Sequence, residues 1–334
     1  MKRAIGSLVV FTFACLLTIP TNAVPSRDDA ADPKKVDADY AIQGEYTGTV
    51  KGKEGDKKLG VQVIALGKHK FRAVGHTGGL PGDGWDKSHG KEEVEATAAD
   101  GVVSFTGKYG TGTIKDGAMT VVNKGGKKIG VLKRVVRESP TLGAKPPKGA
   151  AVLFDGKSAD AFTGRGKGPA RMTKDGLLIQ GANSKQRFGS HTLHFEFRTP
   201  YKPTARGQGR GNSGCYVQGR FEVQVLDSFG LAGKQNECGG IYSIKAPDLN
   251  MCFPPLTWQT YDIDFTAAKF DGKKKTKSAR MTVRHNGVVI HKDVELTHST
   301  TASPLRDTPG PGFLHLQDHG NPVRYRNIWV VEKK

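Results

Sequence analysis

Paired cysteines are missing from this sequence of 334 residues, because none of its four cysteines belongs to a CxxC motif. Structural zinc sites usually draw on such pairs, so the sequence gives no support for a zinc module. Helical periodicity is missing as well from residues 151–334, where apolar residues alternate with polar ones or follow turn signals. Both absences favour a β-rich protein built without a structural metal.

Long hydrophobic runs are absent after about residue 20. Residues 1–23 begin with Lys2 and Arg3, continue as a short apolar stretch and end in the small-residue sequence TNA, which is the pattern of a secretory signal peptide. The apolar stretch at 4–19 is short for a membrane span. We therefore expect a secreted or periplasmic protein with no membrane span after signal cleavage.

Export affects how the cysteines are interpreted, because exported proteins tend to form disulfides. Cys15 lies within the predicted signal peptide, which leaves three cysteines in the mature chain. Cys238 and Cys252 bracket the loop CGGIYSIKAPDLNMC and are predicted to form a disulfide. Cys215 lies in the apolar alternation of a strand and is predicted to be a buried free thiol.

Acidic residues are scarce relative to basic ones: 32 Asp and Glu face 51 Lys and Arg, for a net charge of +19. Such an excess of positive charge suggests a negatively charged partner, such as nucleic acid, an anionic surface or an acidic polysaccharide. No basic helix or RNA-binding signature accompanies it, and the lysines are scattered through turns such as NKGGKKIG and DGKKKTKSAR. We expect no nucleic-acid partner.

Changes in composition divide the chain into segments. Residues 24–39 are polar without periodicity and are predicted to be a disordered tail. Residues 40–137 show short strand patterns between glycine turns and are predicted to form a small all-β accessory domain. Residues 138–150 (ESPTLGAKPPKGA) are predicted to be a linker. Residues 151–334 contain enough antiparallel strand patterns for a jelly-roll β-sandwich.

Three strand patterns in 151–334 carry unusual polar rows opposite their apolar faces. The Gln, His and Arg side chains of such rows are better suited to binding sugar hydroxyls and developing oxyanions than to facing bulk water. FEVQVLD places Glu222 and Gln224 together, and a one-residue bulge would add Asp227 to them. The other rows are His315, Gln317 and His319, and then Arg324 and Arg326.

The row Glu-x-Gln-x-x-Asp resembles the Glu-x-Asp-x-x-Glu strand of laminarinase-type β-glucanases, where two carboxylates act as nucleophile and acid. Here an amide replaces the central Asp, and the shorter Asp227 replaces the second Glu. An ordinary retaining glycosidase is therefore doubtful, although the geometry of the strand can persist.

A more extensive resemblance follows from the motifs LFDGKSADAF, FEFRT, GNSGCYVQGRFEVQVLDS, GGIY, PPLTWQTYDIDF, HNGVVIH and LQDHGNPVRYRNIWV, in this order. Residues 151–334 resemble the 3-keto-disaccharide hydrolase family. The preceding unit, with GVQVIALG and GGLPGDGW, resembles a segment that often precedes this domain in planctomycete secreted proteins. The resemblance implies an all-β, concanavalin-like jelly roll that cleaves glycosides already oxidised at carbon 3.

The implied reaction needs a base for the proton on carbon 2, an acid for the leaving oxygen and donors near the enolate. The polar rows and the aromatic side chains of this domain offer groups of these kinds. We expect the catalytic residues to be Glu222, Asp227 and His319, and the substrate contacts to be Gln224, Gln317, Arg324, Arg326, Tyr242, Trp258 and Glu196.

No cofactor is certain, although a divalent ion could polarise the ketone. The expected partners are the 3-keto sugar and a separate sugar 3-dehydrogenase that would supply it. Two alternatives stay open, namely a non-catalytic carbohydrate-binding jelly roll and a glucanase-like glycosidase, because fold alone does not separate them.

Overall fold

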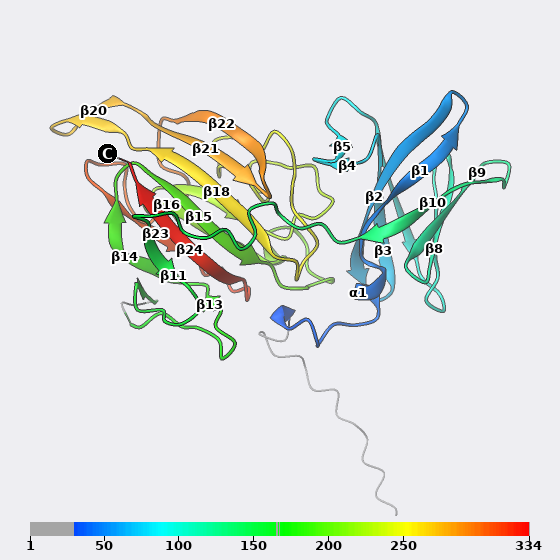
Figure 1. Cartoon of the computed structure of the whole chain (residues 1–334), viewed down its shortest axis with the longest axis horizontal. Coiled ribbons are helices and arrows are strands. Elements are labelled where there is room, and N and C mark those ends of the chain that lie inside the picture. Colours follow the sequence, from blue (N-terminus) through cyan, green and yellow to red (C-terminus); the bar gives the residue numbers. More distant parts are fainter. Residues whose placement is uncertain (1–29, 165, 167, 334) are drawn as a thin grey trace, which may run out of the picture.

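The computed structural model describes residues 30–164, 166 and 168–333, which form two β units joined by an extended segment (Figure 1). Its helices are very short; α1 (Asp39–Ile42) is a single turn. No helix in the described part of the chain is long and apolar enough to cross a membrane. The predicted signal peptide, 1–23, lies outside the described residues.

The N-terminal unit is one curled antiparallel sheet of eight strands whose two end strands approach each other. Alternate residues of β-strands point to opposite faces, so Val61, Val63 and Phe71 enter the interior of the curl while Ile64 and Val74 point outward. A short pair, β4 (Leu80–Pro81) and β5 (Gly84–Trp85), lies beside this sheet. The strand order is β6 (Lys91–Thr97), β3 (Lys70–Thr77), β2 (Gly55–Gly67), β1 (Gly44–Gly52), β10 (Lys128–Val135), β9 (Ala118–Asn123), β8 (Gly110–Lys115), β7 (Val103–Thr106).

The second unit is a sandwich of two antiparallel sheets, which confirms the predicted jelly-roll type of fold. One sheet has the order β11 (Ala151–Phe154), β24 (Arg324–Glu332), β15 (His191–Arg198), β18 (Gln259–Thr266), β21 (Ala279–His285), β22 (Val288–Leu296), with β13 (Leu178–Ile179) paired to β24. We call it the seven-stranded sheet.

The five-stranded sheet packs against it and has the order β12 (Phe162–Thr163), β14 (Ala182–Phe188), β23 (Gly312–Leu316), β16 (Ser213–Val217), β17 (Phe221–Val225). A small hairpin, β19 (Lys269–Asp271) with β20 (Lys274–Lys277), projects from the other sheet.

Apolar alternation fills the sandwich. Phe195 and Phe197 of β15 meet Tyr261 of β18 and Val223 of β17 in one buried cluster. The strong turn signal at Asn286-Gly287 is confirmed as the hairpin between β21 and β22, where both residues take the positive φ values of a tight hairpin turn. Each strand consequently has one face in the core and one face available for chemistry or for further packing.

The segment 138–150, which we call the cover segment, lies against the outer face of the seven-stranded sheet, so the expectation of a plain linker is too simple. The Gly143 N–H donates to Glu196 Oε1 at 2.6 Å, and the Thr141 hydroxyl donates to Asp262 Oδ2 at 2.7 Å. The carbonyl of Ala144 accepts from Asn327 Nδ2 at 3.0 Å. The segment therefore satisfies polar groups on that face and is held in one place.

The predicted disorder of 24–39 is wrong for its described part, residues 30–39. The Tyr201 N–H donates to the carbonyl of Ala30 at 2.7 Å, and its hydroxyl donates to Asp37 Oδ1 at 2.7 Å. Arg198 Nη2 donates to the carbonyl of Ala31 at 3.0 Å. This segment is thus ordered by contacts to jelly-roll residues that lie far away in the sequence.

The two units also meet directly. Ile64 and Val74, on the outer face of β2 and β3, pack on Phe229 of the jelly roll. Arg210 Nη1 donates to the carbonyl of Ala65 at 3.2 Å. The loop that follows β17 is therefore supported by the N-terminal unit.

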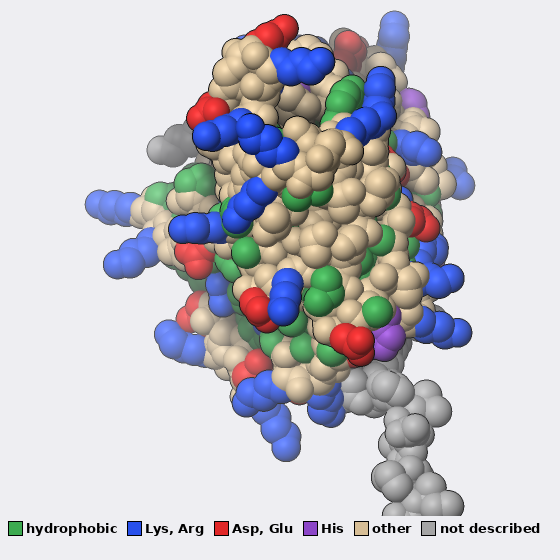
Figure 2. Space-filling view, turned by 90° about the vertical axis from the view of Figure 1, so that its right-hand side faces the viewer, with side chains coloured by type: hydrophobic (Ala, Val, Ile, Leu, Met, Phe, Trp, Pro, Cys, Tyr) green, Lys and Arg blue, Asp and Glu red, His purple; other side chains and the backbone are tan. Residues whose placement is uncertain are grey.

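The excess of positive charge is dispersed over the N-terminal end of the molecule. Figure 2 shows Lys and Arg side chains spread around the margin of that end, with Asp and Glu between them and mostly uncharged surface in the middle. No single basic patch forms on the face in view.

Candidate functional site

Four polar side chains form one transverse row on the outer face of the five-stranded sheet. The register pairs Asn183 of β14 with His315 of β23, His315 with Tyr216 of β16, and Tyr216 with Glu222 of β17. Side chains of directly paired residues lie on the same face of a sheet. The strand pairing therefore brings together residues that are up to about 130 positions apart in the chain.

Glu222 is almost fully enclosed, with 2% of its surface exposed. Burial raises its pKa to about 7, while a hydrogen-bonding interaction with Tyr216 lowers it in part. No Lys or Arg forms an ion pair with Glu222 among the described residues. Its carboxyl is thus poised to take up or release a proton near neutral pH.

Gly214, opposite Gln224 on β16, provides the space for this carboxyl. A Cβ at position 214 would lie 2.0 Å from Glu222 Oε1, closer than two non-bonded atoms can approach. The Glu222 side chain therefore folds over the bare backbone of its neighbouring strand. A larger residue at 214 would displace it.

The side chains beside Glu222 hold defined orientations. Tyr216 donates to the carbonyl of Thr301 at 3.2 Å and accepts from Gln317 Nε2 at 3.3 Å. Burial raises the pKa of the Tyr216 hydroxyl well above its usual value, so this hydroxyl stays protonated. The tyrosine can act as a hydrogen-bond donor throughout the neutral pH range.

His315 is a neutral imidazole at pH 7, because burial lowers its pKa to about 4. Its Nδ1 lies 2.6 Å from Asn183 Oδ1, which can only accept, so Nδ1 carries the proton. The other ring nitrogen, Nε2, then presents a lone pair. The Tyr216 ring lies 5.3 Å from the His315 ring, centroid to centroid.

A cluster of amides continues the polar face beyond Gly214. Gln208 Oε1 accepts from Asn212 Nδ2 at 2.9 Å and from Gln224 Nε2 at 3.1 Å. Gln208 Nε2 in turn donates to the carbonyl of Asn236 at 2.8 Å. Asn212 is 2% exposed, and its Oδ1 has no hydrogen-bond partner among the described residues. An acceptor of this kind suits a sugar hydroxyl.

The loop after β17 borders this face. The Tyr242 N–H donates to the Glu222 carbonyl at 3.1 Å, and the Ser243 hydroxyl lies 2.9 Å from that of Thr301. Asn236, Tyr242 and Ser243 line an open hollow of about 560 Å³. The structure thus brings Glu222, Gln224, Gln317 and Tyr242 into one region, as the sequence predicts.

Asp227 does not belong to the row, and the expected bulge is absent. The register between β16 and β17 is unbroken, and β17 ends at Val225. Asp227 lies beyond the strand end, fully buried, and Arg210 Nε donates to its Oδ2 at 2.7 Å. Its carboxylate is used in a structural ion pair next to the N-terminal unit.

His319 lies on an exposed turn after β23, and its ring makes no hydrogen bond or ion pair in the described part of the chain. Its carbonyl accepts from Asn321 Nδ2 at 3.1 Å. The predicted pairing of His319 with Glu222 is therefore not seen, and His315, four residues earlier, takes the place beside the Glu222–Tyr216 pair.

Glu196, Arg324 and Arg326 lie on the seven-stranded sheet, away from Glu222, and Trp258 lies in the loop just before β18. Arg326 Nε donates to Glu196 Oε2 at 2.6 Å, and its guanidinium lies 4.0 Å from the centroid of the Trp258 ring. Arg324 Nη1 donates to Gln180 Oε1 at 3.1 Å. The strand patterns placed Glu196, Arg324 and Arg326 on an outer face, but they did not tell the two sheets apart.

The predicted disulfide is also absent from the structure, in which Cys215, Cys238 and Cys252 are all buried free thiols. Cys238 and Cys252 do lie side by side within hydrogen-bonding range, as expected from their loop, and Cys238 Sγ is 3.3 Å from the Tyr261 hydroxyl. The expectation for Cys215 is confirmed.

The described residues offer no ready ligand set for a divalent ion. No three His, Cys, Asp or Glu side chains converge within residues 30–164, 166 and 168–333. In the row that contains Glu222, the other such group is His315, whose Nδ1 is hydrogen-bonded to Asn183.

Sequence reasoning missed Asn183, Gln208, Asn212 and Tyr216. Tyr216 lies between the apolar residues Cys215 and Val217, so its outward direction was readable, whereas Asn183 lies between Ala182 and Ser184 and carries a weaker signal. Tyr216 faces Glu222 across the short hairpin of β16 and β17, whereas Asn183 reaches this row only because β14 pairs with β23, about 130 positions away in the chain, and β23 pairs with β16.

Comparison with known proteins agrees with this architecture. Residues 149–331, more than half of the chain, match the model of the 3-keto-alpha-glucoside-1,2-lyase-like domain. A crystal structure of a candidate glycosyl hydrolase from Parabacteroides distasonis is 34% identical, with a TM-score of 0.51, over 56% of this chain and 85% of that one. A second candidate glycosyl hydrolase from the same organism is 18% identical, with a TM-score of 0.43, over 60% and 99% of the two chains. A search of curated proteins gives no match.

Proposed function

Since the chain belongs to the 3-keto-alpha-glucoside-1,2-lyase-like domain family, we propose that it cleaves glycosides whose sugar carries a ketone at carbon 3. The observation that carries this proposal is Glu222, a buried carboxyl with a pKa of about 7 on a polar sheet face. The family and the first of the two glycosyl hydrolase structures support the more general conclusion that the protein is a carbohydrate-active enzyme.

The chemistry follows from the ketone. It acidifies the hydrogen on carbon 2, so a base can remove that proton and leave an enolate. The enolate electrons then form the double bond between carbons 1 and 2, the bond from carbon 1 to the glycosidic oxygen breaks, and this oxygen takes a proton. Water adds across the double bond, with hydroxyl to carbon 1 and hydrogen to carbon 2, so the net result is hydrolysis.

In this proposal Glu222 is the base. Its pKa of about 7 is close to the optimum for removing and returning a proton at neutral pH. Tyr216, held protonated by burial, would turn its hydroxyl proton from the Thr301 carbonyl toward the enolate or the leaving oxygen. The amides of Gln224, Gln317 and Asn212 bind sugar hydroxyls.

The elimination route accounts for an arrangement that an ordinary retaining glycosidase would not use. Retaining enzymes place two carboxyl groups about 5–5.5 Å apart across the bond that is cleaved. Here the neighbour of Glu222 on the same face of the strand is the amide Gln224. The next carboxylate in the chain, Asp227, forms an ion pair with Arg210. A single carboxylate suffices for removal of the carbon-2 proton.

The substrate would need prior oxidation at carbon 3, so we also propose that a separate sugar 3-dehydrogenase supplies it and that both act outside the cytoplasm. The support is the signal-like start of the chain. Fractionation of cells that express the full chain tests the location; recovery of the unprocessed chain in the cytoplasm would contradict it.

The central test compares a 3-keto-glucoside with the matching plain glucoside. Wild-type protein should convert only the former, and Glu222→Gln should lower turnover about 100-fold or more. Glu295→Gln, which alters an exposed carboxylate on β22, is the matched control and should keep full activity.

Three outcomes would count against this assignment. Full activity of Glu222→Gln removes Glu222 as the base. Efficient cleavage of the plain glucoside supports the glucanase-like alternative instead. Binding of both sugars without turnover supports a carbohydrate-binding protein.

A further inference from the structure

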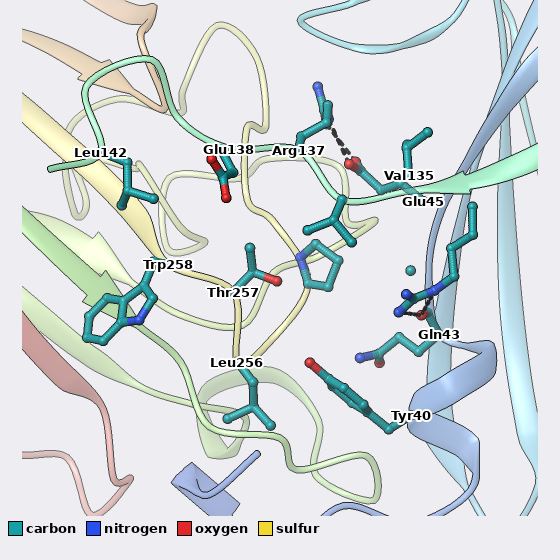
Figure 3. A pocket seen from close by; sticks show the side chains of 14 residues that line it. Tyr40, Gln43, Glu45, Val135, Arg137, Glu138, Leu142, Leu256, Thr257 and Trp258 are labelled. Carbon is teal, nitrogen blue, oxygen red and sulfur yellow. Dashed lines mark hydrogen bonds and ion pairs between the residues drawn. The ribbon is translucent and has the colours of Figure 1, made fainter. Parts of the chain in front are cut away.

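A second concave site lies between the two β units, away from the polar face that carries Glu222. It is a crevice of about 320 Å³ whose walls come from the start of β1, the end of β10, the cover segment and the loop 254–258 (Figure 3). We propose that this inter-unit crevice binds a neutral sugar unit and acts as a non-catalytic anchoring site for a glycan.

The side chains that line the crevice carry no net formal charge. Arg137 grips Glu45 through two hydrogen bonds of 2.7 and 2.6 Å, and Glu45 is 1% exposed. Arg134 donates to the carbonyl of Gln43 at 2.9 and 3.2 Å. With Glu138 at the rim, two guanidiniums face two carboxylates. A neutral ligand therefore fits the crevice better than an anion or a cation does.

Uncharged hydrogen-bonding groups, in contrast, are left without partners. Gln43 is 1% exposed, and its Nε2 has no hydrogen-bond partner in the described part of the chain. Its Oε1 accepts from the Ala65 N–H at 3.1 Å, which fixes the orientation of the amide. Figure 3 shows the amide end of Gln43 directed toward Tyr40 and the middle of the crevice. A buried donor without a partner is costly unless a ligand satisfies it.

The opposite wall has two more uncharged hydrogen-bonding groups without a protein partner. Neither the Thr257 hydroxyl nor the Trp258 indole N–H makes a hydrogen bond within residues 30–164, 166 and 168–333, and both side chains are half-buried. Three uncharged groups on two walls, each without a partner, match a ligand that presents hydroxyls in several directions.

Two aromatic rings, Tyr40 and Trp258, line the crevice, and each is held in place by neighbouring side chains. The Trp258 ring is held by the guanidiniums of Arg326 and Arg198, at 4.0 and 5.0 Å from its centroid. Tyr40 packs edge-on against Tyr201, with 5.1 Å between the centroids. Held rings lose little freedom on binding, and the carbon-bound hydrogens of a pyranose pack well on aromatic surfaces.

The size of the crevice limits the ligand. About 320 Å³ lies at the lower end of the range of roughly 300–1,000 Å³ for small-molecule pockets, which suits one or two sugar rings. Tyr40 and Gln43 come from the N-terminal unit, whereas Thr257 and Trp258 come from the jelly roll, so both units are needed to build the site.

The test measures binding of cellobiose to the full chain by isothermal titration calorimetry. Cellobiose carries no ketone and no charge, so turnover does not interfere under the proposed function. We expect a Kd in the millimolar range, that is, about 4 kcal/mol of binding free energy. Thr257→Val and Trp258→Phe should each weaken binding at least about fivefold, whereas Trp85→Phe, a matched change outside the crevice, should leave the Kd unchanged.

Glu222→Gln serves to separate this site from the catalytic one, and it should bind cellobiose as the wild type does. Glucuronic acid should bind more weakly than glucose. The proposal is overturned if cellobiose does not bind, if binding survives unchanged in both Thr257→Val and Trp258→Phe, or if glucuronic acid binds more tightly than glucose. None of these outcomes bears on turnover of a 3-keto-glucoside.

Discussion

Two buried glutamates occupy corresponding places on the two outer faces of the jelly roll. Glu222 lies on the five-stranded sheet and Glu196 on the seven-stranded sheet, with 2% and 0% of their surfaces exposed. Their proton affinities nevertheless differ widely, because the pKa is about 7 for Glu222 and about 2 for Glu196.

The difference comes from the partners of each carboxylate. Burial by itself would raise the pKa of Glu196, but the His194 ring, 3.9 Å away, and hydrogen bonds from Asn327, Arg326 and the Gly143 N–H outweigh this effect. Glu222 has the interaction with Tyr216 but no cation to counter its burial. A carboxylate that is fully satisfied is structural, whereas one that is buried with few donors is available for proton transfer.

The largest expected effect is on the pH dependence of stability, compared between Glu222→Gln and the wild type. The folded-state pKa of Glu222 is raised, so its stabilising contribution is present below about pH 4.5 and is lost as the pH rises through about 7. The difference in the free energy of unfolding, variant minus wild type, should therefore become about 3 kcal/mol more positive between pH 4 and pH 8. Urea unfolding at both pH values measures it, and a constant difference would contradict the raised pKa.

Glu196→Gln should show the opposite sign. The folded-state pKa of Glu196 is lowered, so its contribution is present above about pH 4.5 and is lost as the pH falls toward 2. At pH 7 the variant should be less stable by about 2 kcal/mol, and this deficit should shrink in acid. Turnover at a temperature where the variant is folded should change less than about threefold. A large loss of turnover would move the site to the seven-stranded sheet.

Gly214→Ala is the smallest change, and it tests the space over which the Glu222 carboxyl folds. The added Cβ meets the mobile end of Glu222, so the carboxyl should shift while the fold remains intact. We expect turnover to fall about tenfold, which corresponds to about 1.4 kcal/mol. Gly189→Ala, where no atom lies within 4 Å of the added Cβ, is the control. Equal activity of both variants would show that the position of the carboxyl is not critical.

Much of the fold was readable from local pattern. Alternation in HTLHFEFRT and FEVQV predicted strands with one apolar face, and Asn286-Gly287 predicted a hairpin turn; all are present. These signals depend on neighbours in the chain, so no tertiary information was needed. The ordering of residues 30–39 and the place of the cover segment were missed because their partners, such as Tyr201 and Glu196, lie 50 to 170 positions away.

For the candidate site, the sequence by itself determined which side chains point away from the core, among them Glu222, Gln224, Gln317, Glu196 and Arg326. Only the tertiary structure decided which of these meet, because strand order assigns Glu222 to one sheet and Glu196 to the other. It also decided their protonation, since a pKa depends on the groups that surround a buried carboxyl in space rather than on its neighbours in the chain.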